Sequence, residues 1–389
     1  MPRRLTPLPI PAGPDALATV LPALAVAIDG SGPALVPLPH DPAAATRLVA
    51  ALRPDHAGYP LEHDVALVVP TTGSTGKPKG ALLGAPALTA SAAATIARLG
   101  GPGRWLLALP LTHVAGLQVL VRSLVGGTEP AALDLTRGFH PDDFAAATAR
   151  LPSRTRRYTS LVPTQLARLL DAGPPAVEAL RAYDAVLLGG AAAPPTLLDR
   201  AQAAGVRVVA TYGMTETCGG CVYDGRPLNG VRVGIGGDGR VRVSGPVLFA
   251  GYRLRPDLTA AALTDGELVT QDLGRVDAQG RLEILGRADD VVVSGGENVA
   301  LCHVEDALRE HPGLREAAVV AVPDAQWGQR LVAVVVPHGP APSIAELRAW
   351  VGARVGQAGA PRGLLVLDAL PLAGPGKLDR QALRRRVQG

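Results

Sequence analysis

The chain has 389 residues, of which 47% are apolar and 19% are charged, and its formal net charge is +4. This composition is typical of a globular protein with more than one domain, and it excludes an intrinsically disordered chain. Only 3% of the residues are aromatic, and the densest basic cluster is the C-terminal run Arg384–Arg386, so we expect no nucleic-acid partner.

The first predicted elements surround a Gly-rich loop. Residues 1 to about 62 are rich in Ala and Pro and contain one helical pattern, at 15–28. The short β-branched run 65–69 predicts a buried strand. The sequence T-T-G-S-T-G-K-P-K-G follows at 71–80, and an Ala-rich stretch at 87–99 predicts a helix.

No segment resembles a membrane anchor or a secretion signal. The most apolar stretch, 105–125, is interrupted by His113 and Arg122, so no run reaches the ~18 residues that a membrane span needs. The basic N-terminus is not followed by a signal-peptide layout, and three cysteines form no disulfide framework. We therefore expect a cytoplasmic protein without a membrane span.

A strand–helix–strand pattern occupies the middle of the chain. We predict strands at 185–188 and 206–210 and a helix at 194–204 that begins with proline. Such a unit implies a parallel sheet. Gly189-Gly190 follows the first strand and T-Y-G-M-T-E-T follows the second, where open α/β sheets bind ligands.

The C-terminal part changes character twice. Apolar residues alternate with charged ones over 231–286, which predicts an antiparallel β subdomain. Beyond it we predict a small α+β unit, with elements at 304–309, 317–322, 331–336 and 344–355. The expected fold is therefore α/β. Its large N-terminal domain, 1–287, combines mixed sheets, flanking helices and the β subdomain, and its small mobile α+β domain is 288–389.

Lysine is nearly absent from this sequence. Only Lys77, Lys79 and Lys377 occur, and every other basic side chain is Arg. Lys supplies a compact charge on a flexible stem and does not replace Arg at a tight site, so we interpret the three as retained for function. The alternative is chance. Asn298, one of two asparagines, lies in the similar Gly-rich segment S-G-G-E-N.

The loop at 71–80 has the chemistry of a polyphosphate site. Glycines let the backbone approach an anion, hydroxyls donate hydrogen bonds and lysines supply charge. It is not a Walker A loop, because Lys77 is followed by Pro78 where Ser or Thr is required. Its composition alone favours a flexible solvated loop, whereas the ordered sequence is far more specific.

This loop resembles the phosphate-binding signature of the acyl-adenylate-forming superfamily, which contains acyl-CoA ligases, peptide-synthetase adenylation domains and luciferases. Four further segments resemble the family's motifs in the same order. They are Y-G-M-T-E at 212–216, Q-D-L-G at 271–274 with G-R-A-D-D at 286–290, S-G-G-E-N at 294–298 and G-K-L-D-R at 376–380. The resemblance spans residues 71 to 380.

The resemblance implies a reaction with ATP, Mg²⁺ and CoA. The family forms an acyl-AMP, releases pyrophosphate and then rotates its small domain for thioester formation. Glu216 would contact Mg²⁺, a cation that takes oxygen ligands. The ATP-binding residues implied are Thr71, Thr72, Ser74, Thr75, Lys79, Gly190, Ala191, Tyr212, Thr215, Asp272 and Arg287.

Four positions in the C-terminal part carry over from the family in the same way. Lys377 would enter the site for adenylation and stabilise charge on the reacting groups. Asp289 would be the hinge, and Gly295 and Gly296 would let the pantetheine arm pass. The alternatives are a surface lysine at 377 and an ordinary turn residue at 289.

His113, in the segment L-P-L-T-H-V-A-G, resembles the acyl-site histidine of acyl- and aryl-CoA ligases. No Asp nearby is placed to pair a substrate ammonium group, which disfavours an amino acid substrate. The C-x-x-C at Cys218 and Cys221 suggests redox or zinc chemistry when taken alone, but it directly follows the Y-G-M-T-E motif. We therefore interpret it as part of the pocket wall.

The segment S-L-V-P-T-Q-L-A-R-L-L at 160–170 is similar to one in the o-succinylbenzoate–CoA ligases of menaquinone biosynthesis. These enzymes activate the succinyl carboxylate of their substrate. The ring carboxylate does not react, and it needs a cation or several hydrogen-bond donors in the protein. We predict Arg168 for that role, with Ser160, Thr164, Gly189 and His113 also at the acyl group. Arg168 as a surface helix residue is equally compatible with the sequence.

Three alternatives to this substrate assignment stay open. They are a ligase for another aryl or acyl acid, an enzyme that loads a carrier protein, and a non-catalytic adenylate sensor. Pro375 departs from the Ser or Thr usual before the Gly-Lys pair. Because the region before the phosphate loop is short, a homodimer is left open. The expected partners are small molecules: ATP, CoA and an aromatic dicarboxylate.

Overall fold

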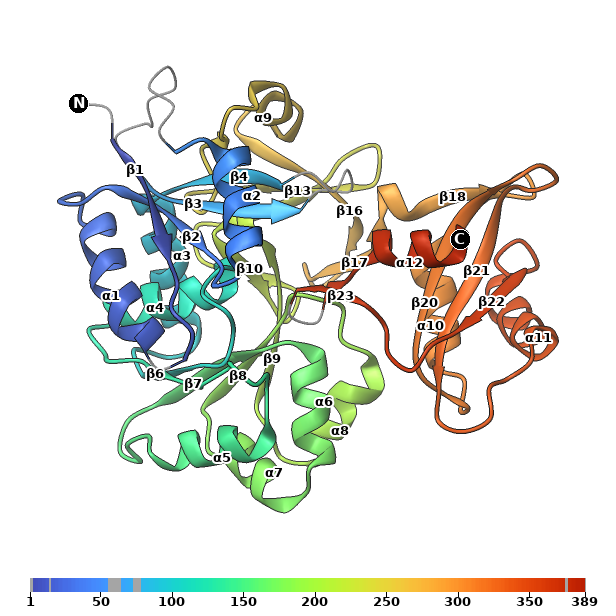
Figure 1. The fold of residues 1–389 in the computed structure, drawn as a ribbon, viewed down its shortest axis with the longest axis horizontal. Helices are drawn as coiled ribbons and strands as arrows, with labels where there is room; N and C mark the ends of the chain where they lie inside the picture. Colours follow the sequence, from blue (N-terminus) through green and yellow to red (C-terminus); the bar gives the residue numbers. More distant parts are fainter. Residues whose placement is uncertain (1–2, 14, 55–63, 73–77, 375–376, 389) are drawn as a thin grey trace. The chain divides into compact units, whose positions relative to one another are not determined.

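The computed structural model describes residues 3–13, 15–54, 64–72, 78–374 and 377–388, without the side chains of residues 72, 372–374 and 377 (Figure 1). Its contacts divide the chain into two compact units. The first comprises 1–234, 242–269 and 276–282, and the second comprises 235–241, 270–275 and 283–389. The boundary at residue 287 that we expected from sequence remains a prediction.

The first unit begins with a five-stranded sheet in the order β1-β2-β3-β4-β14. Its first three strands are parallel, and β3 and β4 form an antiparallel hairpin in which Thr71 lies opposite Lys79. The hairpin thus brings both ends of the Gly-rich loop together. The elements are β1 (Leu5–Pro9), α1 (Asp15–Ile28), β2 (Ala34–Leu38), α2 (Pro42–Leu52), β3 (Val65–Thr72), β4 (Pro78–Gly84), α3 (Ala85–Arg98) and β14 (Gly251–Tyr252).

The N-terminal region contains more structure than the one helix we predicted. That helix is confirmed as α1, but β1, β2 and α2 were missed, because their Pro-rich sequences weaken the periodic pattern. Arg3 fixes this region through its guanidinium. It donates to the backbone carbonyls of Ala27, Gly32 (3.1 and 2.9 Å) and Val65 (2.9 Å), which come from three different segments.

Replacing Arg3 with Ala should lower the free energy of unfolding by about 2 kcal/mol, because several partly buried carbonyls lose a charged donor. Urea unfolding followed by circular dichroism measures this loss. The matched control is Arg4→Ala, whose side chain is exposed and should change the value by less than about 0.5 kcal/mol. Equal effects from the two substitutions would contradict the role of Arg3.

A second, seven-stranded sheet has the order β11-β10-β9-β8-β7-β5-β6. The five strands from β6 to β9 are parallel, whereas β10 and β11 are antiparallel. Helices α5 to α8 pack along one face in a core that includes Phe144, Leu166, Leu180 and Ala201 (Figure 1). The elements are β5 (Arg104–Leu107), α4 (Val114–Val125), β6 (Ala131–Ala132), α5 (Pro141–Ala149), β7 (Arg157–Leu161), α6 (Pro163–Asp171), α7 (Pro174–Arg181), β8 (Ala185–Leu188), α8 (Pro195–Ala203), β9 (Val208–Met214), β10 (Gly219–Tyr223) and β11 (Arg226–Pro227).

The predicted strand–helix–strand unit is confirmed by β8, α8 and β9, whose strands are parallel. The predicted end of the second strand at Ala210 is wrong. Strand β9 continues to Met214, because its last residues pair antiparallel with β10, with Met214 opposite Gly219. The Y-G-M-T-E motif therefore begins inside a strand and ends in a 3₁₀ turn at Thr215–Thr217.

The period-two pattern at 231–286 corresponds mainly to one small sheet, β12-β13-β16-β15, with β17 paired to β16. Buried and partly exposed residues alternate along β16, as we predicted. Two parts of this range differ from the prediction: β14 joins the first sheet, and a short helix, α9, follows it. The elements are β12 (Arg232–Ile235), β13 (Arg240–Ser244), α9 (Pro256–Ala262), β15 (Leu263–Thr264), β16 (Glu267–Val276) and β17 (Leu282–Arg287).

The second unit is built on the sheet β19-β18-β21-β20, with β22 parallel to β21. Helices α10 and α11 cover one face of it and Leu383 of α12 packs on the other (Figure 1). All four elements that we predicted here are confirmed. They and their neighbours are β18 (Val291–Ser294), β19 (Glu297–Ala300), α10 (Leu301–Arg309), β20 (Leu314–Asp324), β21 (Gly328–Pro337), α11 (Ile344–Val355), β22 (Gly363–Val366), β23 (Leu372–Gly374), β24 (Lys377–Leu378) and α12 (Arg380–Gln388).

The α/β fold class is thus confirmed. Within the described ranges, no helix combines the length and apolar character needed to cross a membrane.

Candidate active site

Several predicted residues lie at the carboxyl ends of neighbouring parallel strands in the first unit. Ser160 is buried in β7, and Gly189 and Gly190 follow β8. A Cβ at Gly189 would lie 2.3 Å from the Thr211 Oγ1 atom, so no larger residue fits there without displacing β9. Gly190 has a φ of +81°, which favours glycine. Both positions at this strand end therefore favour glycine.

Two further acyl-site predictions are exposed side chains on helix α6. Thr164 and Arg168 lie four residues apart, so they share one face of the helix. Gln165 anchors the start of the helix, because its Oε1 accepts from Val162 N at 3.0 Å and its Nε2 donates to Ala108 O at 2.9 Å. His113 is also exposed and begins helix α4.

A buried arginine that we did not assign lies next to Ser160. Arg122 on α4 is 4% exposed, and its Nη1 lies 3.5 Å from Ser160 Oγ, its Nη2 3.4 Å from Tyr223 Oη. Among the residues that the structure describes, neither its Nε nor Oε1 of the buried Gln118 one turn earlier has a hydrogen-bond partner, and the Trp105 ring centroid lies 5.0 Å from its Cζ. Within the described part of the chain, Arg122 forms no ion pair. The sequence signal was present, since Arg122 interrupts the most apolar stretch.

The phosphate and metal predictions converge on Glu216. The Lys79 ammonium lies 3.9 Å from Glu216 Oε1, and the Tyr252 hydroxyl donates to the same oxygen at 2.6 Å. Thr215, which precedes Glu216 in the turn, and Tyr212 are partly exposed. A carboxylate next to the ends of a Gly-rich loop suits a Mg²⁺ bound together with phosphates. Tyr252 was missed, because nothing in the sequence links it to Glu216.

Only the two ends of the predicted loop belong to the described residues. Ser74 and Thr75 lie outside the described residues, as does the side chain of Thr72. Thr71 is partly exposed at the end of β3. Ala191 is exposed after β8.

In the second unit, Arg287 connects two predicted residues. Its Nη1 donates to Asp272 Oδ1 at 3.1 Å, while Nε and Nη2 donate to the two oxygens of Asp289 at 2.8 and 3.1 Å. Asp272 is 8% exposed, so the Arg287 guanidinium binds a buried carboxylate. The predicted ribose acceptor, its neighbour and the predicted hinge residue thus form one hydrogen-bonded group.

The predicted pantetheine glycines lie beside an aromatic–cation pair. Gly295 and Gly296 have φ values of +62° and +85°, and a Cβ at Gly295 would lie 3.1 Å from the ring of Trp327. The Arg362 guanidinium stacks on that ring at 3.7 Å and its Nη1 lies 3.4 Å from Ser294 Oγ. Sequence reasoning missed Trp327 and Arg362, which follow the glycines by more than thirty residues.

The lysine segment is anchored by Arg380. Its Nη1 and Nη2 donate to the two oxygens of buried Glu305 at 2.9 and 3.1 Å, and Nη2 lies 3.5 Å from Asp290. Burial raises the pKa of Asp290, and Arg380 opposes that rise. The Lys377 backbone pairs with Gly374, but its side chain lies outside the described atoms. The contacts of Arg380 therefore fix the chain three residues after Lys377.

The cysteines of the C-x-x-C are buried free thiols. Burial raises the pKa of Cys221 to about 11 and also raises that of Cys218, so both stay protonated at neutral pH. The described residues contain no cluster of His, Cys, Asp and Glu that could hold a metal ion. The assignment of Cys218 and Cys221 to the pocket wall remains a prediction.

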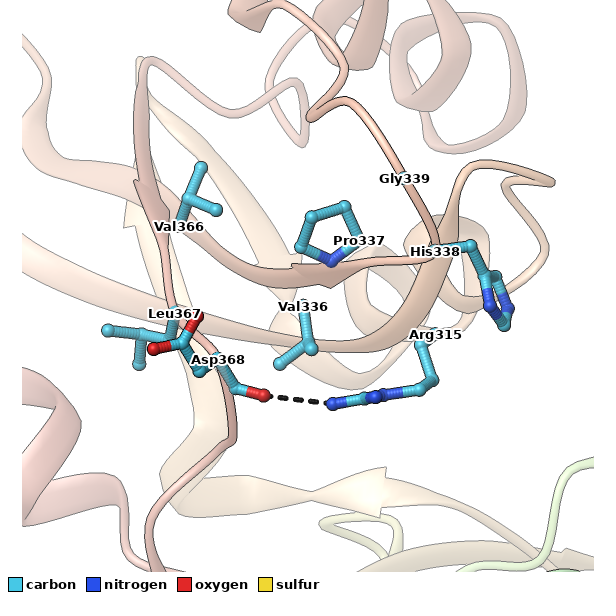
Figure 2. A pocket seen from close by; sticks show the side chains of 8 residues that line it. All are labelled: Arg315, Val336, Pro337, His338, Gly339, Val366, Leu367 and Asp368. Carbon is cyan, nitrogen blue, oxygen red and sulfur yellow. Dashed lines mark hydrogen bonds between the residues drawn. The ribbon is translucent and has the colours of Figure 1, made fainter.

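A pocket in the second unit is lined by none of the predicted site residues. Figure 2 shows its lining from β20, β21 and the end of β22, with Arg315 Nη2 donating to Asp368 O at 2.8 Å. The cavity volume is about 320 Å³. The Val366 and His338 side chains in its lining do not form a set of convergent polar groups. The pocket is therefore a weaker candidate for a ligand site than the one described above.

Comparison with known proteins identifies the class. The family model described as AMP-binding enzyme matches residues 20–253, and that of the AMP-binding enzyme C-terminal domain matches 303–377. The chain belongs to the AMP-binding enzyme family. The family resemblance and fold that we predicted from the motifs are confirmed.

Individual relatives narrow the class further. The chain is 49% identical to a probable 2-succinylbenzoate–CoA ligase of Mycobacterium tuberculosis, with 98% of each chain covered. It is similar to o-succinylbenzoate CoA synthetase of Bacillus subtilis in complex with the acyl-adenylate intermediate (TM-score 0.75, 29% identity, 94% of this chain and 81% of that one). The same synthetase with ATP and magnesium ion gives a TM-score of 0.73 at 28% identity over 94% and 82%. The predicted enzyme class, an AMP-forming acid–thiol ligase, is confirmed.

Proposed function

We propose that this enzyme activates 2-succinylbenzoate with ATP and Mg²⁺ and transfers the acyl group to CoA, a step of menaquinone biosynthesis. The overall similarity to a 2-succinylbenzoate–CoA ligase supports the reaction. The single structural observation that supports the substrate is the buried Arg122 beside Ser160, which forms no ion pair with any described residue.

A buried cation without a carboxylate is costly unless a ligand supplies the missing charge. Among the described residues, Arg122 Nε has no hydrogen-bond partner, its two terminal nitrogens make only long contacts, and the Trp105 ring centroid lies 5.0 Å from its Cζ. The substrate has two carboxylates, of which one reacts and one does not. We assign the unreactive ring carboxylate to Arg122 and Ser160, with Thr164, Gly189 and His113 nearer the reacting end. Arg168, exposed on α6, is the alternative cation.

For adenylation, the residues of the first unit bind the nucleotide. Lys79 with Thr71, Thr72, Ser74 and Thr75 would hold the outer phosphates, and Glu216 would hold Mg²⁺, which supplies positive charge to the phosphate oxygens. Tyr212, Thr215, Gly190 and Ala191 would line the AMP site. A carboxylate oxygen of the substrate attacks the α-phosphorus, the bond to pyrophosphate breaks, and Lys377 stabilises the charge that develops.

For the second half-reaction, the CoA thiolate attacks the acyl carbon and AMP leaves with the bonding electrons. Asp272 and Arg287 would bind the ribose, and Asp289 would supply the torsion change between the two steps. Gly295 and Gly296 give the pantetheine arm access. Trp327 and Arg362, beside these glycines, have the stacking surface and charge that the adenine and phosphates of CoA require.

Substitution of Arg362 with Ala should raise KM for CoA about tenfold and leave acyl-AMP formation unchanged, because only the second substrate loses a cation. Steady-state kinetics with varied CoA and a pyrophosphate release assay without CoA separate the two. The matched control is Arg354→Ala, which removes another guanidinium stacked on a tryptophan, 3.5 Å from the Trp350 ring. A lower rate of acyl-AMP formation in Arg362→Ala would count against the assignment.

The proposed reaction is tested by mass spectrometry of mixtures that contain Mg·ATP, CoA and a single acid. We expect a thioester with 2-succinylbenzoate and none with benzoate, salicylate or medium-chain fatty acids. Acyl-AMP without a thioester would point to a carrier-protein acceptor, and a thioester only with another acid would replace the substrate. A cytoplasmic location and a homodimer are further proposals, and light scattering of the purified enzyme decides the second.

A further inference from the structure

Tyr252 and Lys79 meet at the carboxylate of Glu216. Strand β14 carries Tyr252 and pairs with β4, which carries Lys79, so both side chains come from one edge of the first sheet. The Lys79 ammonium lies 3.9 Å from the centroid of the Tyr252 ring, in cation–π contact. The hydroxyl of the same ring donates to Glu216 Oε1 at 2.6 Å.

Glu216 is held from two sides. Its carbonyl oxygen accepts from Phe249 N at 2.9 Å, and its Oε1 takes the contacts of both Tyr252 and Lys79. Among the described residues, Oε2 has no partner. One oxygen is thus bound by described residues, which leaves the other available to a cation.

We propose that Tyr252 is a positioning residue for the metal–nucleotide complex. Its hydroxyl fixes Glu216 so that Oε2 is presented to the divalent cation, and its ring holds Lys79 where the ammonium meets the outer phosphates. The inference rests on the proposed roles of Glu216 and Lys79 in binding Mg·ATP. It is independent of which acid the enzyme activates.

Tyr252→Phe removes the hydroxyl and keeps the ring, so it tests the hydrogen bond alone. With a non-hydrolysable ATP analogue bound, the dissociation constant of Mn²⁺, measured by electron paramagnetic resonance, should rise about tenfold. Raising the Mg²⁺ concentration should restore most of the adenylation rate. Tyr252→Leu also removes the ring, and it should additionally raise KM for ATP, whereas Tyr252→Phe should leave KM for ATP unchanged at saturating Mg²⁺.

The control is Tyr183→Phe, which deletes the hydroxyl of another buried tyrosine, hydrogen-bonded to Thr148 at 2.8 Å. It should leave Mn²⁺ binding unchanged. Unaltered Mn²⁺ affinity in a folded Tyr252→Phe protein would overturn the inference, as would an equal loss in Tyr183→Phe. If the unmodified enzyme itself binds no metal–nucleotide complex, the proposed roles of Glu216 and Lys79 are wrong. If it binds the complex and the Tyr252 variants behave like the unmodified enzyme, the inference about Tyr252 alone is wrong.

Discussion

Replacing Arg122 with Met should lower kcat/KM for 2-succinylbenzoate about 100-fold, equivalent to about 2.7 kcal/mol of transition-state binding. The substrate's ring carboxylate would lose the charged hydrogen bond of a buried cation. The same substitution should leave kcat/KM for 4-oxo-4-phenylbutanoate unchanged or higher, because that acid lacks the ring carboxylate. Initial rates of thioester formation with both acids measure the difference.

The matched control is Arg168→Met, the same change at the exposed cation on α6. It should affect the two acids equally. A 100-fold loss in Arg168→Met and none in Arg122→Met would assign the ring carboxylate to α6 instead. Stability gives an independent check: Arg122→Met should keep or raise Tm, because it removes a buried charge that has no ion-pair partner among the described residues.

Replacing Lys377 with Ala should lower the rate of acyl-AMP formation by 100- to 1,000-fold, about the effect of removing one preorganised charged donor from a reacting oxygen. Thioester formation from supplied acyl-AMP and CoA should change less than threefold, because the proposed role of Lys377 is confined to the first half-reaction. Pyrophosphate release in single-turnover experiments and mass spectrometry of the second step give the two rates.

Arg385→Ala is the control for Lys377, because it removes an exposed cation from α12 in the same unit. Both half-reactions should keep their rates in that variant. Equal losses in the two half-reactions of Lys377→Ala would show that the lysine supports the fold of its segment rather than adenylation.

The sequence predicts the parts of the candidate site that carry ordered motifs. The loop at 71–80 and the turn at Glu216 are assigned to it because glycines, hydroxyls and charges at fixed spacing leave few alternative explanations. Helix α11 was predicted at its observed bounds, where Ser343 accepts a hydrogen bond from Glu346 N at the N-cap.

The residues that support the site could not be found in this way. Tyr252 reaches Glu216 only because a two-residue strand joins the edge of a sheet formed more than 150 residues earlier. Trp327 and Arg362 meet at Gly295 through pairing of β18 with β21 and of β21 with β22. Such contacts depend on strand order, which one sequence does not reveal. The sequence shows Arg122 as a charged residue within an apolar stretch, but only the structure shows that its side chain is buried.

The central claim is that this enzyme selects an acid with two carboxylates. An equimolar mixture of 2-succinylbenzoate and 4-oxo-4-phenylbutanoate, incubated with Mg·ATP and limiting CoA, tests it directly, because the initial ratio of thioesters equals the ratio of the two kcat/KM values. We predict a ratio of at least about 100 in favour of 2-succinylbenzoate, in keeping with a buried charge pair. A ratio near one would contradict the account.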